Sequence, residues 1–273
     1  MKNAKTPQDS LPGAYTVKSL VKALNILDLL AEGEESAYTL TQLSRHLHLH
    51  ISTVHRLLVN LIGQGFVEEA PRARGYQLSF KALRMGLRVL DRLDFRLVAQ
   101  PLLRELNQQT QENVHLAILQ ETGAICIERF GSAQPVGPEA RLGGVMPLHC
   151  TAAGKTILAY QSGDFLNQFA RKIGFPRFTP STITRLANLK KELERIREQG
   201  YALDQEETVE GLTCVAGPVL DHSGRVVAAF GVAGPATRLT PSVLPDIVRL
   251  VRTTSQKISF RLGYRATPRS MLP

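Results

Sequence analysis

The sequence predicts an α+β chain built from two domains. Between residues 39 and 66, apolar residues recur at helical spacing in two short segments separated by a tight turn. Beyond about residue 95, two pairs of apolar-rich segments are each joined by a short glycine-containing turn, which is typical of β-hairpins. Helical segments border these hairpins, so we expect a second domain with helices around an antiparallel sheet. At 273 residues the chain is long enough to bury two cores.

Composition narrows the classes of protein that the chain can be. Hydrophobic residues make up 43%, yet no run of about 18 apolar residues occurs, so we expect no membrane span. Residues 1–14 have no apolar stretch after their lysines, which predicts a disordered leader and no signal peptide. The sparse cysteines (Cys126, Cys150 and Cys214) favour a reducing cytoplasm. The net charge of +9 favours polyanionic partners, but it is spread evenly along the chain and locates no site.

The first helix of the 39–66 segment begins with a recognisable start signal. Thr39 followed by Gln42 fits a capping box, in which each residue satisfies a free amide of the other at the helix start. Leu40, Leu43 and Leu47 then fall on one face at helical spacing.

The second helix of this segment separates an apolar face from a polar one. Its predicted inward residues are Val54, Leu57, Leu58 and Leu61. The opposite face is short-chained, polar and capable of hydrogen bonding, which suits a DNA groove. Two helices with such a face form a helix-turn-helix. From this face and from the helix before it, we expect these residues to contact DNA: Thr41, Gln42, Arg45, Ser52, Thr53, His55, Arg56 and Asn60.

The neighbouring segments complete a winged helix-turn-helix. Residues 16–31 are predicted to form a helix before the motif. Its predicted buried face consists of Leu20, Leu24, Leu27 and Ala31. After the motif, two short strands flank a tip carrying Arg72 and Arg74, whose long side chains would reach phosphates or the adjacent minor groove. The alternative is a small helical subdomain with an exposed hairpin.

A further helix is predicted to link the two domains. Ser79 can cap its start. A near-heptad apolar stripe follows at Phe80, Leu83, Leu87, Leu90 and Leu97. Such a stripe either packs on its own domain or forms the seam of a dimer, and a protein that reads an operator needs two copies.

The second domain is expected to begin near residue 97. A helix over 102–110 leads into a hairpin over 114–130, and a Pro- and Gly-rich loop covers 131–144. An extended stretch from Met146 leads into a helix, and two more helices follow near 164–172 and 186–199. A second hairpin over 213–234 and a final helix over 242–262 close the domain.

The fragment TAAGKT resembles the end of a phosphate-binding P-loop, but the position that needs the first glycine is His149. The fragment also follows no buried parallel strand, so an ATPase or kinase is not indicated. A helix N-terminus whose free amides hold a carboxylate fits better, and the small Ala152 and Ala153 would admit the anion.

Other candidates for chemistry are weaker. Adjacent His149 and Cys150 would point to opposite sides of an extended segment, so they do not form a nucleophilic pair. Histidines 46, 48 and 50 lack a cysteine or acidic partner, so no metal site and no cofactor is expected. Asp204 and Glu207 could be acid–base groups, a metal site or solvated acids. Asp204 ends a predicted strand, which favours an orientation into a cavity.

Several fragments, in this order, resemble the isocitrate lyase regulator (IclR) family of bacterial transcription factors. They are SLVKALNILDLL, LSRHLHLHISTVHRLLVNLIGQGFV, YQLSFKALRMG, GGVMPLHCTAAGKTILA, REQGYALDQEETVEGLTCVAGPVLD and GRVVAAFGVAG. The resemblance implies a winged helix-turn-helix over residues 15–78, a linker helix over 79–96 and a GAF-like effector domain over 97–267. It also implies binding to double-stranded operator DNA, a small carboxylate effector, and homodimers that often pair into homotetramers.

Carried over residue by residue, the family's recognition pattern falls on Ser52, Thr53 and Arg56. Its effector pocket falls on Met146, Ala152, Ala153, Asp204, Leu212 and Cys214, with Gly231 and Ala233 on a facing strand. The chain departs from the family at His50 and Ile51, where a serine cap and a small or basic residue are more usual. Gly231 and Ala233 stand where many members have serines.

Two functions from different classes follow. Within the family, the chain looks most like regulators of sugar-acid catabolism, with aromatic-acid regulators as the alternative. It would then be a repressor whose effector alters DNA binding. The competing hypothesis is an enzyme acting on a small organic acid, which would depend on Cys150, Asp204 or Cys214. No assembled set of nucleophile, base and oxyanion donor supports it.

Overall fold

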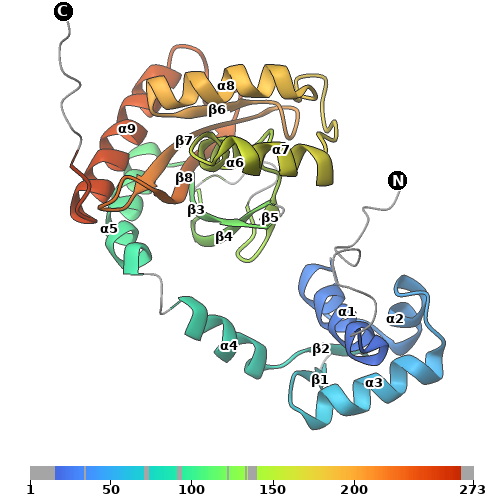
Figure 1. The fold of residues 1–273 in the computed structure, drawn as a ribbon. Coiled ribbons are helices and arrows are strands. Elements are labelled where there is room, and N and C mark those ends of the chain that lie inside the picture. Colours follow the sequence, from blue (N-terminus) through green and yellow to red (C-terminus); the bar gives the residue numbers. More distant parts are fainter. Residues whose placement is uncertain are drawn as a thin grey trace, which may run out of the picture. The chain divides into compact units, whose positions relative to one another are not determined.

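The computed structural model describes residues 16–33, 35–70, 74–90, 94–121, 123–132, 134 and 140–265. The chain divides into two compact units, residues 1–92 and 93–273, whose elements are labelled in Figure 1. The predicted leader over residues 1–14 and the wing-tip Arg72 lie outside the described residues. No helix within the described ranges is long and apolar enough to cross a membrane.

The N-terminal unit has the predicted order of helices followed by a small hairpin. Its elements are α1 (Lys18–Glu32), α2 (Leu40–His46), α3 (Ile51–Gly63), β1 (Val67–Glu69), β2 (Tyr76–Leu78) and α4 (Phe80–Leu90). Strands β1 and β2 pair antiparallel and form the wing. The capping box is present: the Thr39 amide donates to Gln42 Oε1 at 2.8 Å, and the Gln42 amide donates to Thr39 Oγ1 at 3.3 Å. The winged helix-turn-helix prediction is therefore confirmed.

The core of this unit joins the three helices to the wing. Ile26, Leu43, Val54 and Leu58 are fully buried in it, together with Tyr38 ahead of α2. The inward face predicted for α3 is thus observed, because apolar residues at i, i+3, i+4 and i+7 share one side of a helix.

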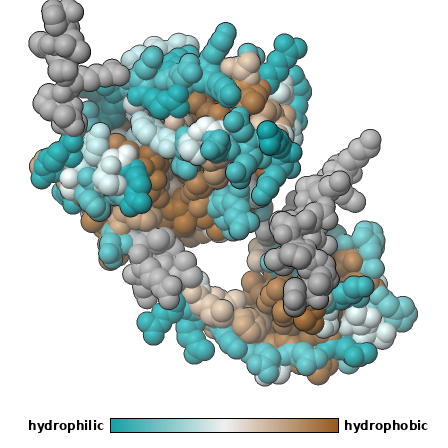
Figure 2. All heavy atoms as spheres, viewed as in Figure 1, coloured by the Kyte–Doolittle hydropathy of each residue, from teal (hydrophilic) through white to brown (hydrophobic). Residues whose placement is uncertain are grey.

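The predicted buried face of α1 is wrong. Leu20 and Leu24 are 57% and 48% exposed, and Ala31 is exposed as well. Ile26 is the fully buried residue of α1, and Leu27 packs partly against the same core. The sequence of α1 is apolar on more than one side, so periodicity did not decide which side faces α3. Figure 2 shows apolar surface that remains exposed on this unit.

The second unit is built on one antiparallel sheet. Its strands are β3 (Asn113–Gln120), β4 (Gly123–Phe130), β5 (Val145–Met146), β6 (Ala202–Gln205), β7 (Leu212–Leu220) and β8 (Val226–Pro235). They lie in the order β5-β4-β3-β8-β7-β6. Both predicted hairpins, β3–β4 and β7–β8, are present, and β3 pairs with β8 to join them into one sheet.

Helices cover both faces of this sheet. They are α5 (Asp94–Thr110), α6 (Ala152–Ala159), α7 (Gly163–Lys172), α8 (Leu186–Gln199) and α9 (Leu244–Arg261). Helices α5 and α9 pack on one face, and α6 lies on the other with α8 beside it (Figure 1). The mixed α+β class predicted from the hairpins and helices is confirmed. Helix α5 starts at Asp94, earlier than the predicted helix over 102–110.

The predicted linker helix over 79–96 falls in two described elements, the end of the first being Leu90 and the start of the second Asp94. Ser79 does act at its start, since Ser79 Oγ accepts from the Lys81 amide at 3.1 Å. The apolar stripe does not pack against its own unit at Phe80, Leu83, Leu87 or Leu97, all of which are exposed.

Candidate functional site

Helix α3 presents its polar face to solvent. Ser52, His55, Arg56 and Asn60 are exposed and Thr53 is half-buried. The start of α3 is capped by His50, whose Nδ1 accepts from the Ser52 amide at 3.3 Å. An imidazole nitrogen here does what a serine oxygen does at other helix starts, so the departure at His50 is compatible with a well-formed helix.

Other residues predicted to contact DNA differ in how free they are to do so. Thr41, Arg45 and Arg74 are exposed. Gln42 uses its carbonyl oxygen in the cap of α2, and Asn60 Nδ2 donates to the Arg56 carbonyl at 2.7 Å. The outer surface of α3 also has an apolar component that the sequence interpretation missed, the exposed Ile51 and Val59.

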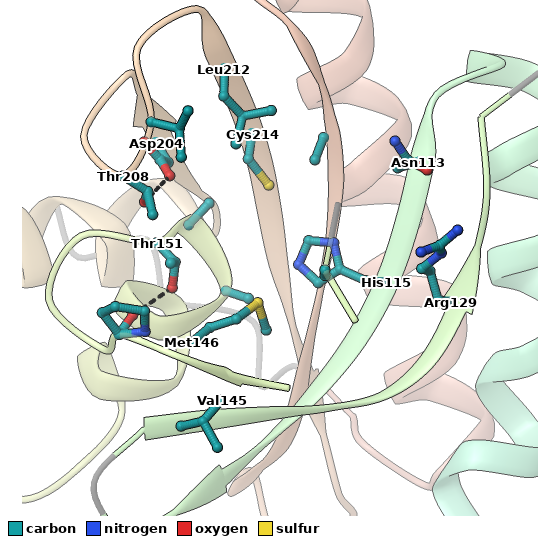
Figure 3. Close-up of a pocket in the computed structure, with 16 residues that line it drawn as sticks. Asn113, His115, Arg129, Val145, Met146, Thr151, Asp204, Thr208, Leu212 and Cys214 are labelled. Carbon is teal, nitrogen blue, oxygen red and sulfur yellow. Dashed lines mark hydrogen bonds between the residues drawn. The ribbon is translucent and has the colours of Figure 1, made fainter. Parts of the chain in front are cut away.

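The second unit contains a pocket of about 240 Å³ between the sheet and the start of α6 (Figure 3). Seven of the eight predicted effector residues line it: Met146, Ala152, Ala153, Asp204, Leu212, Cys214 and Ala233. The eighth, Gly231, lies on β8, directly against the side chains of His115 and Cys214. The structure thus brings the predicted residues together around one cavity.

Strand register explains why residues so distant in sequence meet here. Asp204 pairs with Cys214, Cys214 with Ala233, and Ala233 with Asn113, which makes one row across β6, β7, β8 and β3. Paired residues of neighbouring strands point to the same face of a sheet. In the next row Gly231 pairs with His115. The sheet therefore forms the floor of the pocket, and its small residues leave room for a ligand.

The start of α6 forms another part of the wall. Thr151 is its N-cap: Thr151 Oγ1 accepts from the Gly154 amide at 3.0 Å and donates to the Pro147 carbonyl at 2.6 Å. This cap leaves the amides of Ala152 and Ala153 without a partner among the described residues. Two free amides at the positive end of a helix can bind an anion.

Asp204 is held rigidly at the edge of the pocket. Its carboxylate accepts from Thr208 Oγ1 at 2.6 Å and from the Glu207 amide at 2.8 Å. Burial raises the pKa of Asp204, while these two hydrogen bonds favour its charged form. These contacts fix the carboxylate at the pocket wall, where it can accept a further hydrogen bond.

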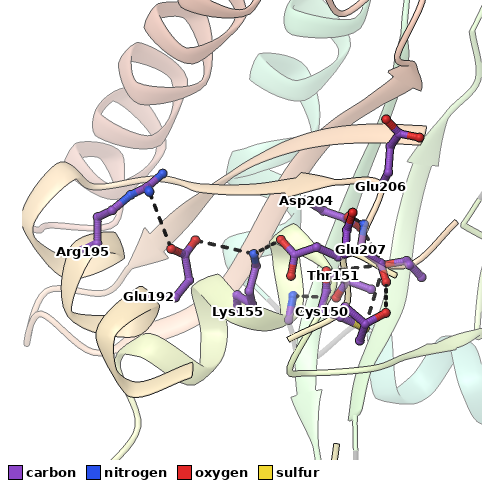
Figure 4. Close-up of polar contacts among 12 residues, drawn as sticks. Cys150, Thr151, Lys155, Glu192, Arg195, Asp204, Glu206 and Glu207 are labelled. Atoms are coloured by element: carbon purple, nitrogen blue, oxygen red, sulfur yellow. Dashed lines mark hydrogen bonds and ion pairs between the residues drawn. The ribbon is translucent and has the colours of Figure 1, made fainter. Parts of the chain in front are cut away.

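A buried ion pair lies next to Asp204 (Figure 4). The Lys155 ammonium, 1% exposed, contacts the Glu207 carboxylate and lies 3.5 Å from Glu192 Oε1 on α8. Burial raises the pKa of Glu207 to about 7, and Lys155 opposes that rise. The P-loop-like lysine is thus a structural cation that ties α6 to α8 and to the segment after β6.

Nine further residues line the pocket that the sequence did not indicate as site residues, and five of them are polar: Asn113, His115, Arg129, Thr151 and Thr208. Only the pairing of β3 with β8 and β4 places the first three there. For Thr151, the helix start predicted at TAAGKT was an available signal. Thr208 lies four residues after Asp204 in a turn whose path the sequence does not reveal.

The cysteines and His149 do not form a nucleophilic site. Burial raises the pKa of Cys150 to about 12 and that of Cys214 well above its usual value, so both thiols stay protonated. The His149 ring contacts the Pro176 carbonyl at 2.9 Å, between Phe175 and Phe178. Neither thiol has the lowered pKa that a reactive cysteine needs.

A winged helix-turn-helix with an outward polar face, joined to a unit with a pocket at the start of a helix, is the arrangement of a ligand-responsive DNA-binding regulator. Residues 19–71 match the IclR helix-turn-helix domain, and residues 87–260 match the bacterial transcriptional regulator IclR C-terminal domain. The chain belongs to the IclR family of transcriptional regulators. It is not an enzyme, since its relatives are regulators.

Curated relatives cover nearly the whole chain. The transcriptional regulator KdgR of Escherichia coli K12 is 34% identical over 253 residues, which are 93% of this chain and 95% of the relative. The repressor AllR of Klebsiella pneumoniae is 35% identical over 248 residues, 91% of each chain.

Solved structures agree with this assignment. The IclR of Thermotoga maritima has a TM-score of 0.73 at 30% identity, covering 90% of this chain and 99% of its own. An IclR homologue from Microbacterium hydrocarbonoxydans, solved with 4-hydroxybenzoate, has a TM-score of 0.78 at 25% identity. It covers 89% of this chain and 98% of its own.

Proposed function

We propose that the chain is a cytoplasmic repressor of a catabolic operon, and that its effector is a small carboxylate of the sugar-acid type. The observation that carries the proposal is the pairing, in one pocket, of two free amides at the start of α6 with the fixed acceptor Asp204. A sugar acid offers the complementary groups, a carboxylate for the amides and hydroxyl donors for Asp204.

The polarity of the pocket orients such a ligand. The carboxylate belongs at Ala152 and Ala153, because the dipole of α6 favours a negative charge there. At Asp204 the same charge would be repelled, while a hydroxyl would donate to the carboxylate. An aromatic acid would satisfy the amides and leave Asp204 without a donor, unless its ring carried a hydroxyl group.

In the DNA-bound state, the outer face of α3 would lie in the major groove, with Ser52, Thr53 and Arg56 at base edges. Exposed Ile51 and Val59 would add apolar contact to thymine methyl groups. The effector can release the operator only by binding the two conformations of the regulator with different affinity.

The repressor would act as a homodimer, which can pair further into a tetramer. Exposed apolar side chains on α1 and α4 support this: Leu20, Leu24, Phe80, Leu83 and Leu87. Exposed apolar surface is a common feature of interfaces, and operator readers gain affinity from two half-sites. Sedimentation equilibrium should give a mass of at least about twice the 30.1 kDa of one chain; a monomer at micromolar concentration would contradict the dimer.

The anion site can be tested with a proline that removes one amide. Ala152 is the first residue of α6 and follows an extended Thr151 (ψ 147°), a geometry that proline accepts. For Ala152→Pro we expect a loss of about 1.5–3 kcal/mol in binding of D-gluconate, the value of a hydrogen bond to a charged group. Titration calorimetry would measure it.

The matched control is Gly163→Pro, at the first position of α7 after an equally extended Ser162 (ψ 155°). It should bind D-gluconate like the unchanged protein. The regulatory step is measured by gel shift, on a DNA fragment that the protein has selected from a random pool. Addition of D-gluconate should release this DNA fragment from the protein. Unchanged binding by Ala152→Pro would remove the α6 amides from the site, and binding of 4-hydroxybenzoate alone would replace the sugar acid by an aromatic acid.

A further inference from the structure

The side of the pocket formed by β3 contains a buried polar group that the proposed binding mode does not use. His115 is 5% exposed, and neither ring nitrogen forms a hydrogen bond within the described part of the chain. Buried polar groups are nearly always hydrogen-bonded, so an unpartnered one in a cavity wall points to a ligand.

The ring of His115 leans from β3 into the cavity, toward Cys214 and Met146 (Figure 3). Gly231 makes this orientation possible. A Cβ at position 231 would lie 2.8 Å from His115 Cε1 and 2.9 Å from Cys214 Sγ, which is too close for a real contact. Because position 231 on β8 has no side chain, the imidazole of His115 from the neighbouring strand β3 occupies that part of the pocket floor.

The imidazole carries no charge at neutral pH. Burial lowers the pKa of His115 to about 4, and Cys214 beside it stays a neutral thiol. A neutral imidazole has one donor and one acceptor nitrogen. Its fitting partner is an uncharged hydroxyl or keto oxygen, whereas a second carboxylate would gain little from it.

The position of His115 also sets the length of ligand that can contact both His115 and Asp204. Strands β8 and β7 separate β3 from β6, the strand of Asp204. With a spacing of about 4.8 Å between strands, a ring leaning over β8 lies roughly 10 Å from the strand of Asp204. A three-carbon acid is too short to contact both groups, whereas a chain of six carbons reaches from one to the other.

We propose that His115 is a specificity residue that selects a carboxylate of about six carbons with a hydroxyl or keto group far from the carboxylate. The α6 amides hold the carboxylate, Asp204 accepts from a hydroxyl near it, and His115 hydrogen-bonds the distant oxygen. This inference rests on the proposed effector site and adds the length and polarity of its ligand.

Calorimetric titration with D-gluconate and with D-glycerate tests the inference on the full-length protein. The unchanged protein should bind D-gluconate more tightly than D-glycerate. His115→Phe keeps the ring volume and removes both hydrogen-bonding atoms, so D-gluconate should bind at least about tenfold more weakly. Binding of D-glycerate should not change. His115→Asn keeps a donor and should recover part of the affinity for D-gluconate.

His222→Phe is the control, because His222 is exposed in the turn between β7 and β8, away from the pocket. It should bind both acids like the unchanged protein. If His115→Phe does not fold, Gly231→Ser serves instead, since its side chain would displace the imidazole and should cause the same selective loss.

The outcomes separate the two proposals. Equal affinity of His115→Phe and the unchanged protein for D-gluconate would overturn the role of His115 and leave the effector site standing. Loss of D-glycerate binding to the same extent would also overturn it, because the effect would then not depend on chain length. An unchanged protein that binds neither acid would overturn both proposals.

Discussion

The outer face of α3 and the wall of the proposed effector pocket both present polar groups, but they are built differently. On α3 the residues lie within one helix, from Ser52 to Asn60, and most are exposed to water. The pocket takes its residues from all six strands of the sheet and from α6, and most of its polar residues are buried. The first surface needs one helix to fold, whereas the second exists only when the whole sheet is paired.

The difference has an energetic consequence. An exposed side chain on α3 can be changed with little effect on stability, because water solvates whatever replaces it. In the pocket region most polar groups and the Lys155 ion pair are removed from water, so their partners decide both stability and binding. Function and stability should therefore separate on α3 and remain coupled around the pocket.

The strongest test of this coupling is Lys155→Met. The substitution leaves Glu207 and Glu192 near each other without the buried cation that lies between them. Removing one partner of a buried ion pair costs about 3–5 kcal/mol in the free energy of unfolding. Urea denaturation at pH 8, followed by circular dichroism, would measure this loss.

Lys190→Met is the matched control, since Lys190 is exposed on α8; it should change the free energy of unfolding by no more than about 0.5 kcal/mol. Adding Glu207→Gln to Lys155→Met should restore part of the loss, because the uncompensated charge is then removed. A cost below about 1 kcal/mol for Lys155→Met would show that the pocket region is no more coupled to stability than a surface.

The same contrast explains what could be predicted from the sequence. Helix periodicity identified the buried residues of α3, and the turn signals identified both hairpins, because these are local patterns. Helix periodicity did not decide which side of α1 is buried, since Leu20, Leu24 and Ile26 are all strongly apolar. The place of the effector residues came from the family resemblance, and they remain predictions as ligand contacts. His115 and Arg129 reach the pocket only because the predicted β3–β4 hairpin pairs with β8, far along the chain, and no local pattern reveals that pairing.

A pH-dependent stability of intermediate size should come from His115. Its pKa is about 4 in the folded chain and 6.5 in the unfolded one. Between these values the unfolded state binds the proton and the folded state does not, so the free energy of unfolding falls as pH decreases. The loss from pH 7 to pH 4 should reach about 3 kcal/mol.

Comparison with His115→Gln isolates this contribution, since glutamine does not titrate and the other groups are shared. Glu207 acts in the opposite direction, since its raised pKa of about 7 makes the chain more stable as pH falls from 7 toward its unfolded value of 4.5. Because both proteins contain Glu207, its contribution cancels, and the unchanged protein should lose about 3 kcal/mol relative to His115→Gln from pH 7 to pH 4. A constant difference from pH 7 to pH 4 would mean that His115 is hydrated in the folded chain.

The smallest effect is expected on α3, where it should appear in DNA binding and not in stability. Arg56→Ala should weaken binding to the selected DNA fragment by about 1–3 kcal/mol if Arg56 contacts a base edge. The free energy of unfolding should change by no more than about 0.5 kcal/mol, because Arg56 is exposed. Arg252→Ala removes the same charge from an exposed position on α9, so a general electrostatic effect would weaken binding in both variants. A specific contact would weaken DNA binding only in Arg56→Ala. If Arg56→Ala also lost a similar amount of unfolding free energy, function and stability would be coupled on α3 as they are around the pocket.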